Sequence, residues 1–206
     1  MVRVRSGHPD WCPISAKDCQ LCCYFFRQLA AQSTKFTRMN AQISYSPLTV
    51  GDVEGLVPVL HCEEVYAFIG GMPSRDDFTL GLCRAIHGPS GKTADEHWIN
   101  YAVRLIETGE LIGRVEATVH DNLAEVAFLF NPAVWGHGYA TEGLLWLHNH
   151  LRVKHSISAL WATTHPKNAR SAALLRKVGY TQAVTHGLPQ LYSYDEGDLV
   201  FQLILD

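Results

Sequence analysis

A turn that contains two glycines leads directly into a helical pattern in the second half of the chain. The stretch Trp135-Gly136-His137-Gly138-Tyr139-Ala140-Thr141-Glu142 follows an apolar run that ends at Phe130. The first N–H groups of a helix have no intrahelical partner, and the helix dipole there favours an anion. Gly136 and Gly138 have no Cβ atoms to keep a phosphate away, and Ala140 is small. The stretch is a candidate phosphate cradle, and a plain connecting turn is the alternative.

Side chains that could move a proton stand on a predicted strand from Leu111 to His120. Period-two alternation places Glu116, Thr118 and His120 on one face of this strand. A carboxylate on that face could hold a water molecule that takes a proton from a substrate, and Glu125 on the next strand is a further candidate base. The alternative is an exposed or salt-bridged strand face.

Two other motifs lack the context that their chemistry requires. The segment Gly88-Pro-Ser-Gly91-Lys92-Thr93 has the ending of a phosphate-binding P-loop, but Ile86 stands where that loop needs a glycine, and a helix precedes it instead of a strand. Four of the six cysteines lie near the start of the chain, at Cys12, Cys19, Cys22 and Cys23. A zinc site needs a second pair at a set spacing, which is missing. We therefore expect an exposed loop, free thiols and no metal site.

The elements that would position these residues follow from the apolar pattern. We predict helices over Val50–Leu60, from Ser74 through Ile86, over Gly138–Lys154 and over Asn168–Val178. We predict strands near Ile43–Leu48, Trp98–Leu105, Leu111–His120, Leu123–Phe130, Ala159–His165, Tyr180–Val184 and Leu199–Leu205, with a hairpin turn at Glu107–Glu110. This order predicts an α+β domain around a mixed sheet.

Composition limits the class of protein. The chain has 206 residues, of which 47% are apolar and 18% are charged, as in a globular protein with one domain and an appendage. The net charge of −3 does not imply a nucleic-acid partner, and no apolar run approaches the length that spans a bilayer. Residues 1–38 show no regular pattern, so we expect a poorly ordered or tag-like N-terminal extension there and a single domain over residues 39–206.

Two of these stretches together resemble the signatures of the GNAT N-acetyltransferases. In that superfamily, Gln/Arg-x-x-Gly-x-Gly/Ala binds the pyrophosphate of acetyl-CoA, and it falls here on Trp135 to Ala140, with Trp135 in place of Gln or Arg. The stretch Trp161–Gln182 resembles the second signature, in which a strand leads to an Asn, here Asn168, and a short helix ends in a Gly-aromatic pair. The form WGxGYAxE is similar to the RimJ/RimL-like branch, which acetylates the N-termini of ribosomal proteins. The resemblance covers roughly residues 43–205.

The resemblance implies a fold, a reaction and a set of site residues. The fold is a mixed, largely antiparallel twisted sheet flanked by helices, with a splayed central strand pair. The reaction is direct transfer of an acetyl group from acetyl-CoA to a primary amine in a ternary complex. The amine belongs to a protein N-terminus or to a small molecule. The implied cofactor-binding residues are Phe128, Leu129, Phe130, Trp135, Gly136, His137, Gly138, Tyr139, Ala140, Thr141, Asn168 and Ser171, and the catalytic candidates are Ser171, Glu116 and His120.

The source of the proton for the departing thiolate leaves a second function open. Many relatives use a Tyr seven residues after the Asn, where this chain has Leu175. Ser171 matches a Ser that is proposed for this role in the ribosomal-protein branch. Local hydrogen bonding would also explain Ser171, and an N-cap would explain Asn168. An inactive acyl-CoA-binding module is the alternative function.

The remaining expectations concern partners and the acceptor. The resemblance places the acceptor pocket at roughly residues 65–77 and 188–198. We expect a cytoplasmic monomer or homodimer whose partners are acetyl-CoA and an amine, without a metal, nucleic acid or membrane.

Overall fold

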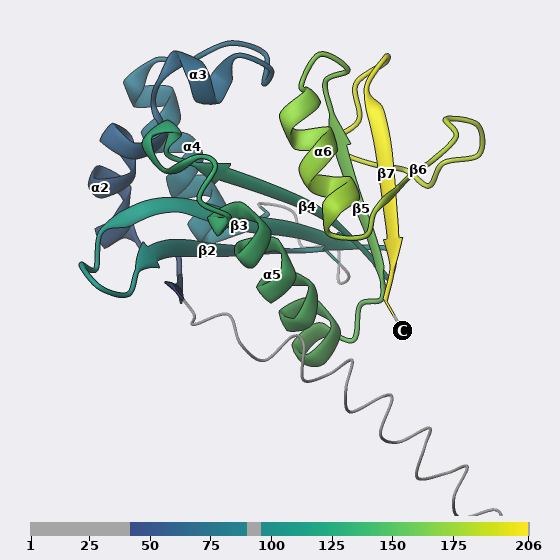
Figure 1. Cartoon of the computed structure of the whole chain (residues 1–206), viewed down its shortest axis with the longest axis horizontal. Coiled ribbons are helices and arrows are strands. Elements are labelled where there is room, and N and C mark those ends of the chain that lie inside the picture. Colours follow the sequence, from purple (N-terminus) through teal and green to yellow (C-terminus); the bar gives the residue numbers. More distant parts are fainter. Residues whose placement is uncertain (1–41, 90–95, 206) are drawn as a thin grey trace, which may run out of the picture. The chain divides into compact units, whose positions relative to one another are not determined.

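A seven-stranded sheet in the order β1-β2-β3-β4-β5-β7-β6 forms the centre of the domain (Figure 1). The computed structural model describes residues 42–89 and 96–205. The strands are β1 (Ile43–Pro47), β2 (His97–Leu105), β3 (Leu111–His120), β4 (Leu123–Phe130), β5 (Ala159–Thr164), β6 (Thr181–Gln182) and β7 (Leu199–Ile204). Neighbouring strands pair antiparallel, except that β4 and β5 are parallel. The predicted mixed, largely antiparallel sheet is confirmed.

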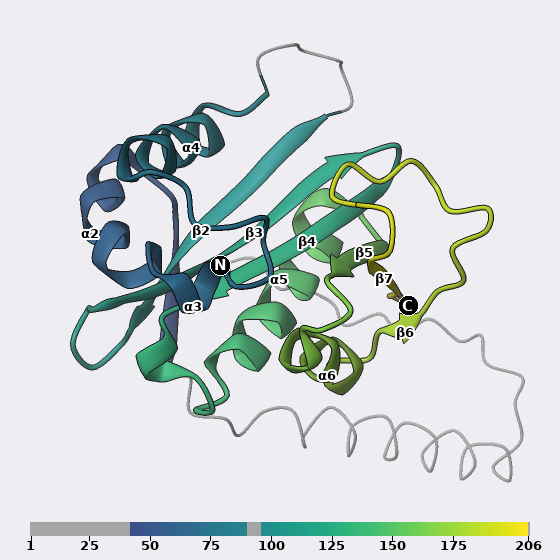
Figure 2. The same ribbon diagram turned by 90° about the horizontal axis from the view of Figure 1, so that it is seen from above.

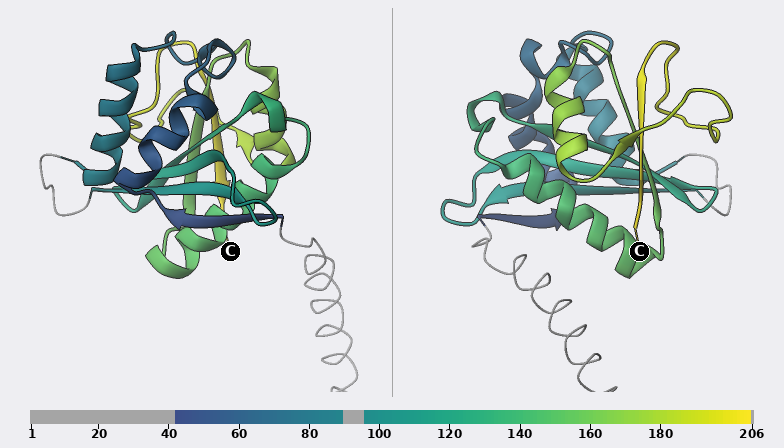
Figure 3. Two further views of the ribbon diagram at one scale, coloured as in Figure 1. Left: turned by 90° about the vertical axis from the view of Figure 1, so that its left-hand side faces the viewer. Right: turned by 45° about the vertical axis from the view of Figure 1, so that its right-hand side comes forward.

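Helices pack on both faces of the sheet, with α2 and α4 on one face and α5 on the other (Figure 3). The helices are α2 (Val50–Leu60), α3 (Glu63–Tyr66), α4 (Arg75–His87), the 3-10 turn η1 (Pro132–Val134), α5 (Tyr139–His155) and α6 (Ala169–Lys177). On the first face, Leu56 of α2 and Leu82 of α4 pack with Ala102 of β2. The sheet thus separates two apolar cores, and a third, small core around Trp161 lies beneath the loop before β7.

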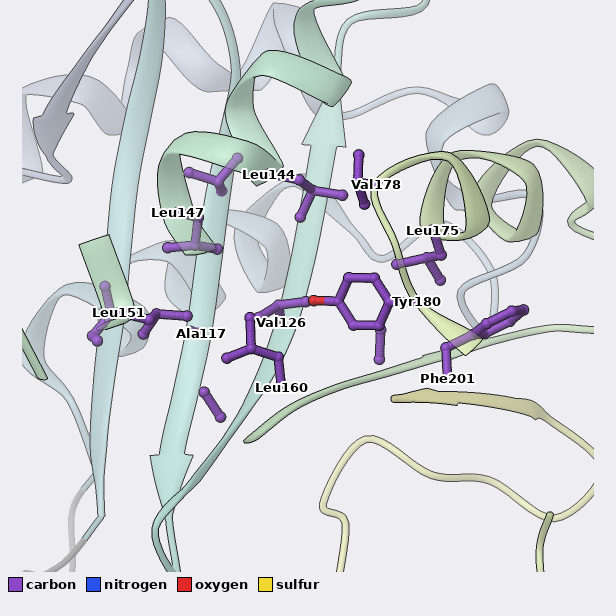
Figure 4. Packing of buried hydrophobic residues seen from close by; sticks show 14 of the residues in the cluster. Ala117, Val126, Leu144, Leu147, Leu151, Leu160, Leu175, Val178, Tyr180 and Phe201 are labelled. Atoms are coloured by element: carbon purple, nitrogen blue, oxygen red, sulfur yellow. The ribbon is translucent and has the colours of Figure 1, made fainter. Parts of the chain in front are cut away.

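The larger core joins α5 and α6 to the central strands (Figure 4). Leu144, Leu147 and Leu151 follow helical spacing along α5 and are fully buried. Gly143 lies on the same side, and a Cβ atom there would come within 3.2 Å of both Val115 and Phe130. A glycine at this position therefore lets α5 approach β3 and β4 closely, which sets the height of the helix above the sheet.

Most predicted elements are confirmed to within a residue or two. Strands β3 and β4 and helix α2 have the predicted bounds. Ser74 caps α4 as predicted, because its hydroxyl accepts a hydrogen bond from the N–H of Asp77 at 3.1 Å. Strand β6 is shorter than predicted, since the chain leaves the sheet after Ala183 bonds to Val200 and leaves Val184 78% exposed. Helix α3 was not predicted, because its four residues are too few for a periodic pattern.

Some predicted features lie outside the described residues. These are the N-terminal extension with Cys12, Cys19, Cys22 and Cys23, and most of the segment that resembles the end of a P-loop. Within the part of the chain that the structure describes, no helix is long and apolar enough to cross a membrane.

Candidate functional site

The parallel strands β4 and β5 pair at their beginnings and then diverge (Figure 1). Their ladder joins Leu123 to Ala159, Ala124 to Leu160 and Glu125 to Trp161. Beyond this point β5 continues to pair with β7, while β4 continues along β3 to Phe130. Ala127 is consequently exposed in the middle of the sheet. The predicted splayed central pair is confirmed, and it leaves one side of the β4 backbone free of β5.

A cavity of about 730 Å³ opens at this divergence. Four segments line it: α3 and the residues after it, the end of β4, the turn into α5 with its first residues, and one side of α6 with the two residues before it. Eleven of the twelve predicted cofactor-binding residues are on its wall, namely Phe128, Leu129, Phe130, Trp135, Gly136, Gly138, Tyr139, Ala140, Thr141, Asn168 and Ser171. His137 is not among the described residues of the wall, and its Nδ1 lies 3.1 Å from the carbonyl oxygen of Val134.

The turn into α5 has the backbone geometry that the two glycines allow. Gly136 and Gly138 have φ angles of +84° and +89°, which other residues rarely adopt. Gly138 is the N-cap of α5 and has no side chain to cap the helix. The N–H groups of Tyr139, Ala140 and Thr141 therefore remain available at the cavity wall, where the helix dipole favours an anion. The residues present fit the phosphates of a CoA-type ligand.

The guanidinium of Arg170 lies against Trp135, the uncharged residue at the first position of the first signature. It lies 4.0 Å from the centre of the Trp135 ring, a cation–π contact. The indole N–H of Trp135 donates to the carbonyl oxygen of Phe130 at 2.8 Å, which fixes the ring. Lys167 and Lys177 also line the cavity. The sequence pattern did not single out these three cations, although Arg170 and Lys177 are seven residues apart on α6 and so lie on one face of the helix, with Lys167 just before its N-cap.

Asn168 and Ser171 lie together at the start of α6. The side-chain oxygen of Asn168 accepts a hydrogen bond from the N–H of Ser171 at 3.1 Å, so Asn168 is the N-cap. This bond uses the Ser171 backbone, and both residues lie on the cavity wall. Leu175 is only 1% exposed and belongs to the core, whereas the adjacent Leu174 lines the cavity.

Glu116 lies on β3 beside the point where β4 and β5 diverge. It is not among the described residues that line the cavity. It pairs across the sheet with the exposed Ala127, one residue before the cavity-lining Phe128. Its carboxylate forms an ion pair with Arg114 at 2.8 Å. The salt-bridged strand face that the sequence left open is therefore present, next to the splay.

His120 lies in a buried cluster away from the described cavity wall. Its ring contacts Glu125 at 2.7 Å and Asp121 at 3.0 Å, and it stacks on Tyr192. Burial lowers the pKa of His120, but hydrogen bonds to Asp121 and Glu125 outweigh it and raise the pKa above its ordinary value. The structure gives His120 a packing role, and its role as a base stays a prediction.

Glu125, the third candidate base, is fully engaged by the loop before β7. It accepts hydrogen bonds from the N–H of Tyr192 at 2.7 Å, from the N–H of Ser193 at 2.9 Å and from the Ser193 hydroxyl. Together with its contact to His120, these bonds occupy both carboxylate oxygens. Glu125 therefore anchors the loop to the sheet.

Apolar side chains gather at the side of the cavity where the acceptor was predicted. Phe68 and Ile69 line the cavity and are 41% and 50% exposed. The Phe68 ring stacks on His165 at the end of β5, with ring centres 5.7 Å apart. This contact links the α3 side of the opening to the α6 side.

The described residues contain no group of three or more His, Cys, Asp or Glu side chains that could hold a metal ion. His97, His150 and His155 do form a chain of ring contacts at 5.3–5.4 Å. Burial lowers the pKa values of His150 and His155 below their ordinary value.

Comparison with known proteins places this architecture in a family. The model of the family described as "Acetyltransferase (GNAT) domain" matches residues 43–181, which is well over half of the chain. No curated protein sequence matches the chain.

Solved structures have the same fold at low sequence identity. An acetyltransferase from Salmonella typhimurium that modifies the N-terminal serine of ribosomal protein L7/L12 has a TM-score of 0.66 and 13% identity, over 81% of this chain and 97% of that chain. An acetyltransferase from Agrobacterium tumefaciens str. C58 has a TM-score of 0.64 and 21% identity, over 81% and 93%. The ribosomal L7/L12 acetyltransferase RimL in complex with coenzyme A has a TM-score of 0.64 and 14% identity, over 81% and 96%. The family match, the sheet and its splay agree, and the chain belongs to the GNAT acetyltransferase family.

Proposed function

We propose that the chain transfers an acetyl group from acetyl-CoA to a primary amine by direct attack in a ternary complex. The observation that carries this proposal is the divergence of β4 from β5 at a cavity that also contains the uncapped start of α5. The C–N bond forms while the thioester C–S bond breaks, the amine loses a proton and the thiol gains one. The reaction needs no further reactant.

The chain offers different groups to different parts of acetyl-CoA. Bound acetyl-CoA would supply an activated acyl group. The free side of β4 from Phe128 to Phe130 presents N–H and C=O groups that can pair with the amides of an extended ligand. The N–H groups at the start of α5, together with Arg170 and Lys167, suit its phosphates.

Two side chains would transfer protons in the proposed reaction, one as a base and one as an acid. Glu116 stands beside the exposed Ala127, where it can receive the proton of the attacking amine directly or through water. Ser171 lies on the cavity wall at the first turn of α6, where its hydroxyl can donate to the departing thiolate. His120 is the second candidate base, although Glu125 and Asp121 hold its ring.

A catalytically inactive acyl-CoA-binding module is the second candidate function. The burial of Leu175 in the core favours it, since this is the position at which many relatives have a catalytic Tyr. The two functions differ in whether bound acetyl-CoA is ever consumed.

Thiol release with a panel of amines and peptides tests the proposal, with acetyl-CoA affinity measured separately by calorimetry. We expect Glu116→Gln and Ser171→Ala each to lower kcat by about 100-fold, the usual scale for a general base or acid, with the Kd for acetyl-CoA unchanged in Glu116→Gln. Thr118→Ala, on the same face of β3 as Glu116, is the matched control and should retain activity. A wild-type protein that binds acetyl-CoA and acetylates nothing in the panel would support the binding module instead.

A further inference from the structure

The Arg114–Glu116 ion pair lies beside the part of β4 that no longer pairs with β5, on the face of the sheet opposite α5. Arg114 pairs across the sheet with Leu129, which lines the cavity, and Glu116 pairs with the exposed Ala127. Figure 2 looks onto this face, with α2 and α4 on one side of strands β2–β4 and the loop before β7 on the other. The pair therefore lies between the two small cores of this face, next to the point where an acceptor would meet the acyl group.

The polar groups around this ion pair are incompletely satisfied. One terminal nitrogen of Arg114 contacts Glu116 at 2.8 Å, but Nε and Nη1 are buried without a hydrogen-bond partner among the described residues. Asn100 lies directly across from Glu116 on β2, and its side-chain oxygen is also buried without such a partner. The amide nitrogen of Asn100 already donates to the carbonyl oxygen of Ala85 at 3.0 Å. Folded proteins leave few buried polar atoms unpaired, and three such atoms here belong to Arg114 and Asn100, which neighbour Glu116 along β3 and across on β2.

The opposite charges of Glu116 and Arg114 determine which class of ligand could bind beside them. A carboxylate accepts hydrogen bonds from an ammonium group, and a guanidinium donates to a carbonyl or carboxylate oxygen. Arg114 and Glu116 are two residues apart on one strand face, which separates their Cα atoms by about 7 Å. A polyamine would bring a second cation towards Arg114, and Glu125, the nearby acid that could offset it, is already engaged by the loop. An amine with an oxygen two or three bonds away fits this pair better.

We propose that Arg114 orients acceptors that carry an α-amino-acyl group, by donating to the acyl oxygen while Glu116 receives the amine. This inference rests on the proposed function and adds a specificity residue to it. The side chain of Arg114 is 14% exposed and that of Glu116 is 26% exposed. The Tyr66 phenol lies close enough to both for their charges to act on its pKa, which burial raises. Tyr66 and the segment after it therefore border the place where the acceptor would enter.

Steady-state kinetics with matched acceptors test the role of Arg114. The acceptors are alaninamide, free alanine, and propylamine, which lacks the oxygen; spermidine serves as the polycation. We expect Arg114→Gln to raise the KM for alaninamide about tenfold or more, the scale of a lost charge-assisted hydrogen bond, with the KM for acetyl-CoA and the rates with propylamine unchanged. Arg114→Lys should recover part of the loss. Arg75→Gln, which removes an exposed ion pair between Arg75 on α4 and Glu54 on α2, is the control.

The outcomes separate the two proposals. Equal effects of Arg114→Gln on alaninamide and propylamine, or a wild-type preference for spermidine, would overturn the role of Arg114 while the acetyltransferase assignment stands. If the wild type acetylates no amine, calorimetry of alaninamide with the CoA-bound protein tests the role of Arg114 instead. The wild type and Arg114→Lys should bind alaninamide, and Arg114→Gln should not. A preference for alaninamide over alanine indicates a peptide N-terminus, and the reverse indicates a free amino acid. Thermal unfolding of each variant identifies losses that come from misfolding.

Discussion

Single residues bring a positive charge to the cavity wall beside Trp135, the uncharged first residue of the first signature. Trp135 cannot pair with a phosphate, but its flat ring holds the guanidinium of Arg170 at 4.0 Å. The sequence shows Trp135 as a departure from the signature, and it shows Arg170 as an ordinary helix residue. The contact between them depends on where α6 begins relative to η1, which no local pattern contains.

The charge of Arg170 should therefore contribute to cofactor affinity. We expect Arg170→Ala to weaken acetyl-CoA binding about threefold to tenfold, because an exposed cation contributes modestly to a phosphate contact. The effect should shrink at high salt, which screens exposed charges. Arg176→Ala on the same helix is the control, since Arg176 packs on Phe201 outside the described cavity wall. Equal losses in the two variants, measured by calorimetry, would show that Arg170 has no specific role.

At the scale of elements, the turn and helix α5 together form the candidate anion site. The helix supplies N–H groups and a dipole, and the positive φ angles of Gly136 and Gly138 aim them at the cavity. These features were readable from the sequence, because a helix start and its glycines are local. The bounds of β3 and β4 were readable for the same reason, since β3 alternates from Arg114, β4 is a nearly continuous apolar run, and Asp121-Asn122 and Asn131-Pro132 end them.

A charge placed at the start of α5 should interfere with this site. We expect Gly138→Glu to lower acetyl-CoA affinity by about tenfold or more, because a carboxylate there would compete with phosphate and repel it. Gly138→Ala is the matched control, since both variants carry the same strain at φ +89° and only one carries a charge. If the two variants lose the same affinity, strain and not charge explains the effect, and the cradle assignment is wrong.

At the scale of the whole domain, one buried hydrogen bond joins α5, which begins at the candidate phosphate cradle, to the second signature. The hydroxyl of Tyr180, just after α6, lies 3.1 Å from Nε2 of His148 on α5. Both side chains are buried, so the bond couples the packing of the two helices. Burial lowers the pKa of His148 to about 4.

This depressed pKa predicts acid sensitivity of the fold. In the unfolded chain His148 titrates near 6.5, so between that pH and about 4 the unfolded state binds more protons than the folded state. The free energy of unfolding should therefore fall as the pH drops through this window, by about 3 kcal/mol from this group. His148→Gln should flatten the dependence in urea unfolding at several pH values, whereas the exposed His186→Gln should not. If His148→Gln keeps the pH dependence of the wild type, that dependence comes from other groups.

The sequence by itself determined the helices, most strands and the family, and it pointed to the candidate phosphate cradle, because each depends on the order of residues along a short segment. Tertiary structure alone decided which distant residues meet. Glu125 was a candidate base by sequence, and the loop at Tyr192 and Ser193 engages it across more than sixty positions. Asn100 and Glu116 become neighbours only through the register of β2 on β3. Strand register and the divergence of β4 from β5 arise from packing over the whole domain, and they set the acceptor side of the site.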